Sequence, residues 1–182
     1  GPVPRRLLAL GLSALLAVAL VAIASAAAAP REPEQLTPVV GNAIASPEPV
    51  LTSNGRREMA YELQLINRSE STVTVRSLEA LAGGKVVQRL SGAALEAQMQ
   101  PYGQQKHSIK LGPGQGAYVL MDVSLARKAK VPAGLTHRIA LTMAPKQAAV
   151  ATSYELAPIK VTRREAVVVA PPLRGPGWVV AN

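Results

Sequence analysis

The sequence predicts an all-β fold, an immunoglobulin-like antiparallel β-sandwich of about seven to nine strands preceded by an N-terminal signal helix. Four segments alternate apolar and polar side chains with the two-residue period of a strand: 59–66, 72–81, 117–125 and 136–143. Gly83–Gly84 predicts a tight hairpin turn between two strands. Strands do not alternate with helices along the chain, which argues against a parallel α/β sheet.

The other predicted elements are shorter. Further strands are expected at 85–90, 108–111, 154–156 and 159–161. The alanine-rich segment Ser91–Gln100 is the one predicted helix of the sandwich, with Ser91 as its candidate N-cap. The loop Gly112–Gly116 is expected to join two strands of a hairpin rather than to bind phosphate, because no helix follows it.

The composition fits one domain plus an export segment in 182 residues. Hydrophobic residues make up 48% and charged residues 17%, which supplies enough apolar material for a core and argues against disorder. Aromatic residues make up only 3% and phenylalanine is absent, so the core must consist mainly of aliphatic side chains. Because cysteine is absent, disulfides, thiolate nucleophiles and cysteine-ligated metals are excluded.

Residues 1–26 have the three parts of a secretory signal peptide. Arg5–Arg6 is the basic part, residues 7–23 are the apolar part, and Ala24–Ser25–Ala26 fits the A-x-A cleavage rule. We therefore expect cleavage after Ala26 and export to the periplasm, the cell wall or the medium. The alternatives are an uncleaved membrane anchor over residues 7–29 and a twin-arginine signal.

Changes in composition divide the rest of the chain into three parts. Residues 27–46 are expected to be a Pro-rich linker that leads into a first edge strand, and residues 47–165 the sandwich. Residues 166–182 are apolar, rich in proline and glycine, and contain the only tryptophan, Trp178. This composition suggests a tail or the start of a downstream domain.

The chain carries a formal net charge of +9, which favours anionic partners such as wall polymers. Its basic residues form short groups that are dispersed along the sequence, at Arg56–Arg57, Arg127–Lys130 and Arg163–Arg164. We interpret them as a solvated basic surface. Nucleic-acid binding is not expected, because the few aromatic residues do not alternate with the basic ones.

No catalytic, cofactor or metal site is predicted. The chain has two histidines, His107 and His137, and one aspartate, Asp122, without the spacing of a zinc site or of a serine triad. Asp122 is expected to face solvent. A copper site could use His107, His137, Met121 or Met143, but His137 and Met143 lie ~20 Å apart on one strand and cannot share an ion. We expect methionines in the core and histidines at the surface.

The order of several motifs resembles a known family. They are Leu63–Asn67, Val73–Glu79, Leu111–Gly114, Ala117–Val123, Val131–Ile139 and Pro171–Asn182. Together they look like the non-catalytic N-terminal domain that precedes the peptidase domain in exported lysostaphin-type zinc peptidases. The most specific part is the stretch that begins Pro171–Pro172–Leu173–Arg174–Gly175 and reaches Trp178, which resembles the entry into the peptidase domain. The resemblance covers roughly residues 36–182.

The resemblance implies an accessory role, because the family's catalytic His and Asp motifs do not occur in this sequence. The domain would position or shield a downstream zinc peptidase domain, packing against it through Val167, Val168, Val169 and Trp178. A second hypothesis is an autonomous envelope module that binds wall polymer or a protein partner. A third is an enzyme or metal carrier with an arrangement that the sequence does not reveal.

Overall fold

A computed structural model describes residues 35–144 and 150–164 of the chain. The expected signal peptide lies outside these residues, and so do Val167, Val168, Val169 and Trp178. Within the described residues, no helix is long and apolar enough to cross a membrane.

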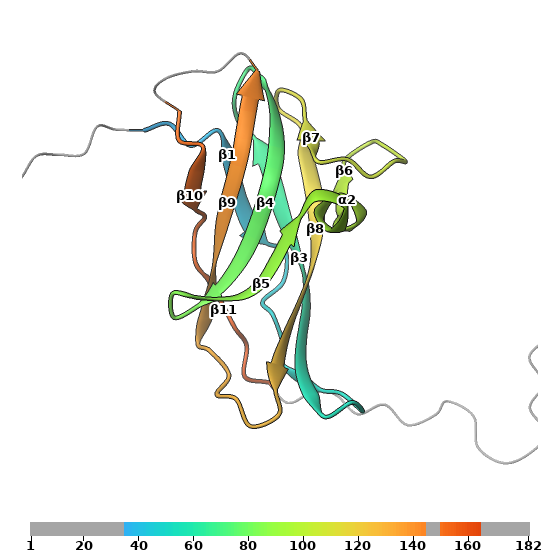
Figure 1. The fold of residues 1–182 in the computed structure, drawn as a ribbon, viewed down its shortest axis with the longest axis vertical. Helices are drawn as coiled ribbons and strands as arrows, with labels where there is room; N and C mark the ends of the chain where they lie inside the picture. The colour runs from blue at the N-terminus through green and yellow to red at the C-terminus, as the bar shows by residue number, and fades with distance from the viewer. Residues whose placement is uncertain (1–34, 145–149, 165–182) are drawn as a thin grey trace, which may run out of the picture. The chain divides into compact units, whose positions relative to one another are not determined.

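Two antiparallel sheets form the sandwich that the sequence predicted (Figure 1). The five-stranded sheet has the order β1 (Val39–Ala43), β3 (Arg56–Asn67), β8 (Gly116–Ala126) and β6 (Met99–Pro101), and β2 (Val50–Leu51) also pairs with β3. The six-stranded sheet has the order β10 (Ser153–Glu155), β9 (Gly134–Ala144), β4 (Thr72–Ala82) and β5 (Lys85–Ser91). In this sheet β11 (Ile159–Lys160) pairs with β9, and β7 (Lys110–Leu111) pairs with β4.

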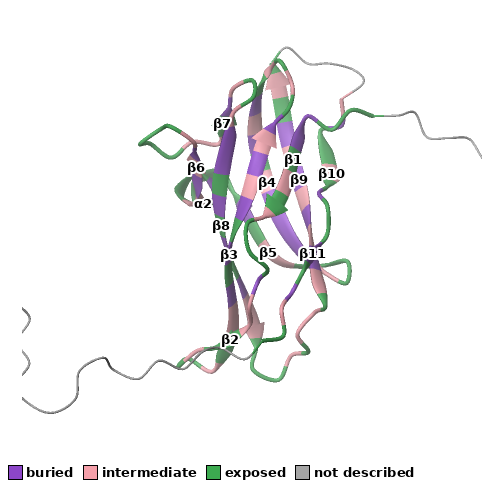
Figure 2. Ribbon diagram, turned by 180° about the vertical axis from the view of Figure 1, so that it is seen from behind, coloured by how far each residue is buried: buried purple, intermediate pink, exposed green. Residues whose placement is uncertain are grey.

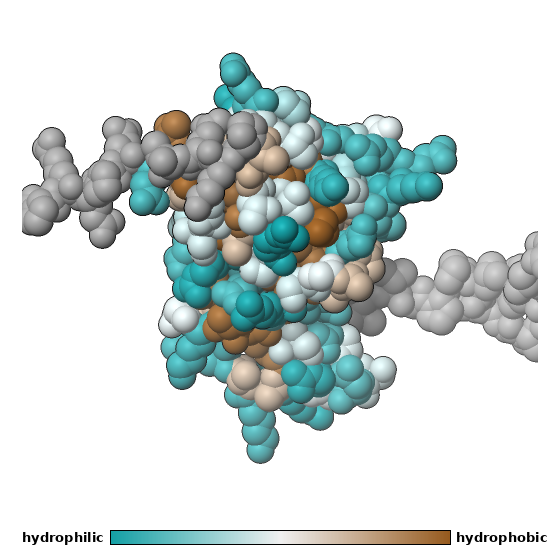
Figure 3. All heavy atoms as spheres, turned by 45° about the horizontal axis from the view of Figure 1, so that its top comes forward, coloured by the Kyte–Doolittle hydropathy of each residue, from teal (hydrophilic) through white to brown (hydrophobic). Residues whose placement is uncertain are grey.

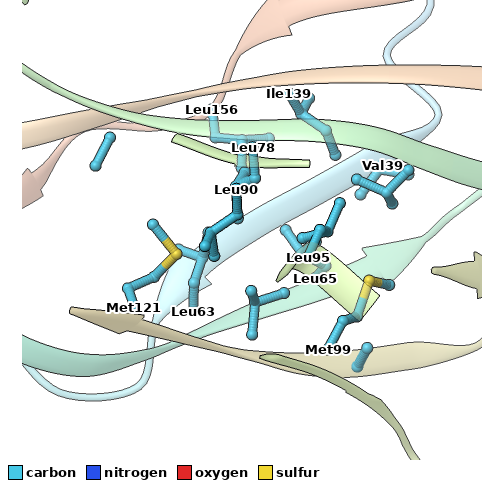
Figure 4. Packing of buried hydrophobic residues seen from close by; sticks show 14 of the residues in the cluster. Val39, Leu63, Leu65, Leu78, Leu90, Leu95, Met99, Met121, Ile139 and Leu156 are labelled. Carbon is cyan, nitrogen blue, oxygen red and sulfur yellow. The ribbon is translucent and has the colours of Figure 1, made fainter. Parts of the chain in front are cut away.

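The core lies between the two sheets. Alternate residues of β3, β8 and β9 are buried, as the strand period predicts (Figure 2). β4 alternates at its start, but Leu78–Leu81 are all buried. Figure 4 shows how side chains from both sheets meet there, among them Leu63, Leu78, Met121 and Ile139. Tyr61 is the one aromatic residue among the buried hydrophobic side chains of the described residues, so the core is aliphatic as the composition predicted.

The short helix and the hairpin before it lie close to their expected positions. Gly83 and Gly84 have φ values of 55° and 79°, the left-handed backbone that a two-residue hairpin loop needs. The helix α2 spans Gly92–Gln98, and Leu95 is its buried residue. Ser91 occupies the N-cap position but makes no side-chain capping hydrogen bond. The chain turns from β5 into α2 at Gly92, whose φ is 53°.

Two sequence-based expectations need correction. β1 lies inside the stretch 27–46 that we expected to be a linker, and Val39 is fully buried. The sandwich therefore begins at β1, because Val39–Ala43 pairs with Leu63–Asn67 of β3. The Gly112–Gly116 loop does not close a hairpin, because it joins β7 of one sheet to β8 of the other.

Hydrophobic and hydrophilic side chains are both present on the described surface. On the face seen in Figure 3, hydrophobic side chains reach the surface in separate patches between hydrophilic ones. The large hydrophobic residues that are exposed include Tyr118 and Leu120, both on the outer face of β8.

Candidate functional site

Basic side chains that are far apart in the sequence meet at one end of the sandwich. Arg56, the first residue of β3, pairs with Ala126, the last residue of β8. The loop that follows β8 carries Arg127, Lys128 and Lys130. Figure 1 shows this loop and the start of β3 together at the bottom of the view. Antiparallel pairing therefore joins two basic groups that are about 70 positions apart in the chain.

The third basic segment reaches the same end through β11. Lys160 pairs with Gly134, where β9 begins directly after the β8–β9 loop. The main-chain N–H of Val161 donates to the carbonyl oxygen of Ala133 at 3.0 Å. Arg163–Arg164 follow within the described residues. This short pairing holds the last basic group beside the loop.

A direct contact also joins the first two groups, since Arg57 Nε donates to the carbonyl oxygen of Arg127 at 3.0 Å. We refer to this surface as the basic end. It is defined by eight side chains: Arg56, Arg57, Arg127, Lys128, Lys130, Lys160, Arg163 and Arg164. All of them are exposed except Arg57, which is half-buried. The charge is therefore presented to solvent rather than used inside the fold.

A groove of about 850 Å³ opens at the basic end. Lys160, Arg163 and Arg164 line it together with the small residues Ala45, Ser46 and Ala133. Glu48 is the one carboxylate in its lining. Small side chains keep the groove open, and long basic side chains along it can reach a bound anion from several directions.

Nearby carboxylates compensate little of this charge. Glu58 lies 3.9 Å from Arg56, and the Arg56 side chain is still 48% exposed. Exposed pairs of this kind contribute only about 0.2–1 kcal/mol, so an external anion can compete with them. Away from this end, Glu79 pairs with Arg89 at 3.2 Å and with Arg138 at 3.3 Å, and Arg138 also pairs with Glu155 at 3.1 Å. The basic end therefore gathers eight basic side chains, of which only Arg56 has an ion pair among the described residues.

A second cluster of chemically capable groups is buried. The Tyr61 hydroxyl oxygen lies 2.6 Å from His137 Nε2, and both residues are buried in the core. Burial raises the pKa of Tyr61 and lowers the pKa of His137 to about 4. At neutral pH the two groups are uncharged hydrogen-bond partners. Because His137 is fully buried, we interpret the pair as a core contact rather than a surface site.

The structure separates the residues considered for a metal. His137 is buried in the middle of β9, which corrects the expectation of a surface histidine. His107 is exposed on the connection between β6 and β7, where its Nδ1 lies 3.2 Å from the carbonyl oxygen of Met99. Asp122 is exposed, as expected. Among the described residues, no group of three or more His, Asp or Glu side chains could hold a metal ion.

The sequence identified each of the three basic groups, but it did not indicate that they lie together at one end of the sandwich. Apart from Arg57, these side chains are exposed, as expected of a solvated surface, and β3, β8 and β11 bring the three groups together at one end, which the sequence did not indicate. One available signal was that Arg56–Arg57 begins a predicted strand and Arg127–Lys130 follows another. That signal becomes informative only when the two strands are known to pair.

Comparisons with known proteins do not indicate a function for this chain. No family model matches the chain. No curated protein matches it either. Among the solved structures that resemble it, the three described next have low identity and low TM-score.

The first is a FixG-related protein from Vibrio parahaemolyticus, with 16% identity and a TM-score of 0.35 over 69% of this chain and 98% of that one. The second is a protein described as ApaA from Bordetella pertussis, with 16% identity and a TM-score of 0.39 over 71% and 99% of the two chains. The third is a structural-genomics target designated SoR45, with 10% identity and a TM-score of 0.37 over 75% and 92%.

Proposed function

We propose that this domain is a non-catalytic module of the cell envelope that binds an anionic polymer through the basic end. The observation that carries the proposal is the convergence of Arg56–Arg57, Arg127–Lys130 and Lys160–Arg164 at one end of the sandwich. The envelope location rests on the signal-peptide pattern of residues 1–26, which lie outside the described residues.

The physical basis is multivalent charge attraction. A polymer with a negative charge on every unit can contact several basic side chains at once, and its binding releases condensed counterions. Long, exposed Arg and Lys side chains suit such a ligand because they adapt to an irregular chain of phosphates. The groove beside Lys160 gives the polymer a path across this end.

Purified wall teichoic acid is the probe that tests the proposal. The decisive variant reverses three exposed charges in the β8–β9 loop, as Arg127→Glu, Lys128→Glu and Lys130→Glu. The matched control reverses three exposed charges outside the basic end, as Arg68→Glu, Lys106→Glu and Lys110→Glu. Arg68 follows β3 at the end of that strand opposite to Arg56. Both variants change the net charge equally, so only the position of the charge differs.

We expect the loop variant to lose at least about tenfold in affinity at low salt, since three ion pairs of roughly 0.5 kcal/mol each are lost and replaced by repulsion. The control should lose less than about threefold, through its change in net charge alone. Equal losses of affinity in both variants would show that binding depends on net charge alone and not on the basic end. Stronger binding to phosphatidylglycerol vesicles than to the polymer, at equal phosphate, would reassign the surface to membranes.

The accessory role beside a peptidase domain is a second proposal that the basic end supports. Arg163 and Arg164 belong to this surface and directly precede residues 165–182. A catalytic domain joined to that side of the chain would be held close to the bound wall polymer. In a longer version of the chain, ¹⁵N relaxation should show the two domains tumbling together. Independent tumbling would contradict a positioning role.

A further inference from the structure

A second surface, distinct from the basic end, lies on the outer face of the five-stranded sheet. Tyr118, Leu120 and Asp122 of β8 are exposed there and alternate with buried residues (Figure 2). Glu62 of β3 pairs with Leu120, and the main-chain N–H of Ile44, directly after β1, donates to the carbonyl oxygen of Glu62 at 3.0 Å. Three neighbouring segments of the chain therefore place Ile44, Glu62 and Leu120 in one row across this face.

This face is hollowed into a groove of about 540 Å³, which we call the tyrosine groove. Its apolar and aromatic lining consists of Ile44, Tyr118 and Leu120. Its polar lining consists of Glu62, Gln98, Gln100 and His107. Sites for small ligands have volumes of roughly 300–1,000 Å³, so the groove suits a small ligand or one short segment of a longer chain.

The ring of Tyr118 is held in place by a second tyrosine. Its centroid lies 4.5 Å from that of Tyr102, at an interplanar angle of 57°. Tyr102 in turn lies against Gly116, where an added Cβ atom would be 2.6 Å from the tyrosine ring. Gln64 Nε2 donates to the Tyr102 hydroxyl oxygen at 2.7 Å. The aromatic surface is therefore fixed before a ligand binds, which lowers the entropy that binding costs.

The polar side chains beside this ring supply both donors and acceptors. The amides of Gln98 and Gln100 each carry a carbonyl oxygen and an NH₂ group, and Glu62 carries a carboxylate. Contacts with the main chain position two of the polar groups. Gln100 Nε2 donates to a main-chain carbonyl oxygen at 3.3 Å, and His107 Nδ1 lies 3.2 Å from the carbonyl oxygen of Met99. A ligand hydroxyl both donates and accepts, so it can pair with groups of each kind.

The charge of the tyrosine groove differs from that of the basic end. No lysine or arginine of the described residues lines it, and Glu62 is the one carboxylate in its lining. An anionic ligand would therefore meet no cationic side chain here and would be repelled by Glu62. The lining favours a neutral ligand that has an apolar face and several hydrogen-bonding groups.

A sugar ring has this combination of properties. Its C–H face can stack on an aromatic ring, which presents a partial negative charge, while its hydroxyl groups bond to polar side chains. An acetamido group on the sugar adds a methyl group and an amide, which match the exposed Leu120 and Ile44 beside the glutamine amides. A proline-rich peptide would also use the aromatic ring, but it has few donors for the carboxylate and the amide oxygens.

We infer that the tyrosine groove binds a neutral glycan that contains N-acetylated hexosamine units. One sugar ring stacks on Tyr118 and pairs its hydroxyl groups with Gln98 and Gln100. The methyl of its acetamido group lies against Leu120 and Ile44. This site takes a neutral ligand and uses none of the residues of the basic end, so it is independent of the binding proposed there.

The probe is tri-N-acetylchitotriose, and the control is cellotriose, which has the same linkage and a hydroxyl in place of each acetamido group. We expect tri-N-acetylchitotriose to bind with a Kd below about 1 mM, and cellotriose to bind at least about fivefold more weakly. In ¹⁵N–¹H spectra, the amides of Ile44, Tyr118 and Leu120 should shift most. No binding of tri-N-acetylchitotriose, equal binding of the two sugars, or shifts centred elsewhere overturns the inference.

Two variants at one position test the stacking. Tyr118→Ala removes the ring and should weaken tri-N-acetylchitotriose binding at least about tenfold, whereas Tyr118→Phe keeps the ring and should weaken it less than about threefold. Tyr118 is exposed, so both variants should keep the dispersed ¹⁵N–¹H spectrum of the folded domain. Equal binding by the two folded variants overturns the inference.

A matched pair of leucines tests recognition of the acetamido group. Leu120 lines the groove and Leu51 of β2 does not, although both are 51% exposed. Leu120→Ala should lower the affinity for tri-N-acetylchitotriose to that for cellotriose, and Leu51→Ala should leave both affinities unchanged. Equal effects of the two substitutions would contradict the inference. So would a decaproline peptide that binds more tightly than tri-N-acetylchitotriose and depends on Tyr118, because it would assign the groove to proline-rich chains.

Discussion

Tyr61 of β3 and His137 of β9 form a hydrogen bond across the core, with 2.6 Å between the hydroxyl oxygen and Nε2. Their rings meet edge to face, with centroids 5.7 Å apart. The other ring nitrogen, Nδ1, is buried without a partner among the described residues. This contact is a polar link between the two sheets inside an otherwise aliphatic core, and His137 depends on Tyr61 for its side-chain hydrogen bond.

Removing the tyrosine hydroxyl should therefore destabilise the domain. Tyr61→Phe leaves a buried imidazole without a side-chain partner, which costs about 1–3 kcal/mol. Tyr118→Phe makes the same chemical change on a side chain that is 41% exposed, and it should cost less than about 0.5 kcal/mol. Urea denaturation at neutral pH measures both values. Equal unfolding midpoints for the two variants would contradict the role assigned to this pair.

Burial of His137 also makes stability depend on pH. Its pKa falls from 6.5 to about 4 in the folded state, so the unfolded state binds the proton more readily. The stabilisation is fully present above pH 6.5 and is lost as the pH falls toward 4. At about 1.4 kcal/mol per pKa unit, the loss is roughly 3 kcal/mol. Tyr61 stays uncharged over this range because burial raises its pKa.

The His137 imidazole resonances report this directly in the intact protein. Their chemical shifts should stay constant from pH 7 to about 5.5, where an ordinary histidine would be largely protonated. Urea titrations at the two ends of the range should show the lower stability in acid. A midpoint near pH 6.5 for these resonances would refute the prediction.

A methyl group at Gly134 should disturb both the fold and the basic end. A Cβ atom there would lie 2.8 Å from the carbonyl oxygen of Ile159, so β11 would have to move. Gly134→Ala should cost about 1–3 kcal/mol and weaken polymer binding, because β11 holds Lys160 beside the β8–β9 loop. Gly112→Ala is the matched control, since its Cβ would meet only Gln115 Oε1 at 3.6 Å. Thermal unfolding and teichoic acid binding of both variants test this.

The long strands could be predicted from the sequence because local alternation determines them. β3, β4, β8 and β9 each include an expected segment and extend it by a few residues. His137 is in phase with Ile139 and Leu141 on β9, so the same alternation already indicated its burial. The expected surface position followed from the polarity of histidine, although the position of His137 in the strand alternation indicated burial. The hydrogen bond to Tyr61 resolves that conflict, since a buried imidazole needs a partner.

The features that sequence reasoning missed depend on long-range pairing. β1 lies in a proline-containing segment with little alternation, and its place is set by its pairing with β3. The basic end depends on the register of β3 with β8 and on the return of β11 to the start of β9. A local sequence pattern does not show which strands pair or in which register.

A residue-level titration with teichoic acid tests the central claim most directly. In ¹⁵N–¹H spectra at low salt, the account predicts that the largest shifts occur at Arg56–Arg57, Arg127–Lys130 and Lys160–Arg164. Amides near Arg68 and Lys110, outside the basic end, should change little. Shifts spread evenly over all exposed basic residues, or centred away from the basic end, would contradict the claim that this surface is the binding site.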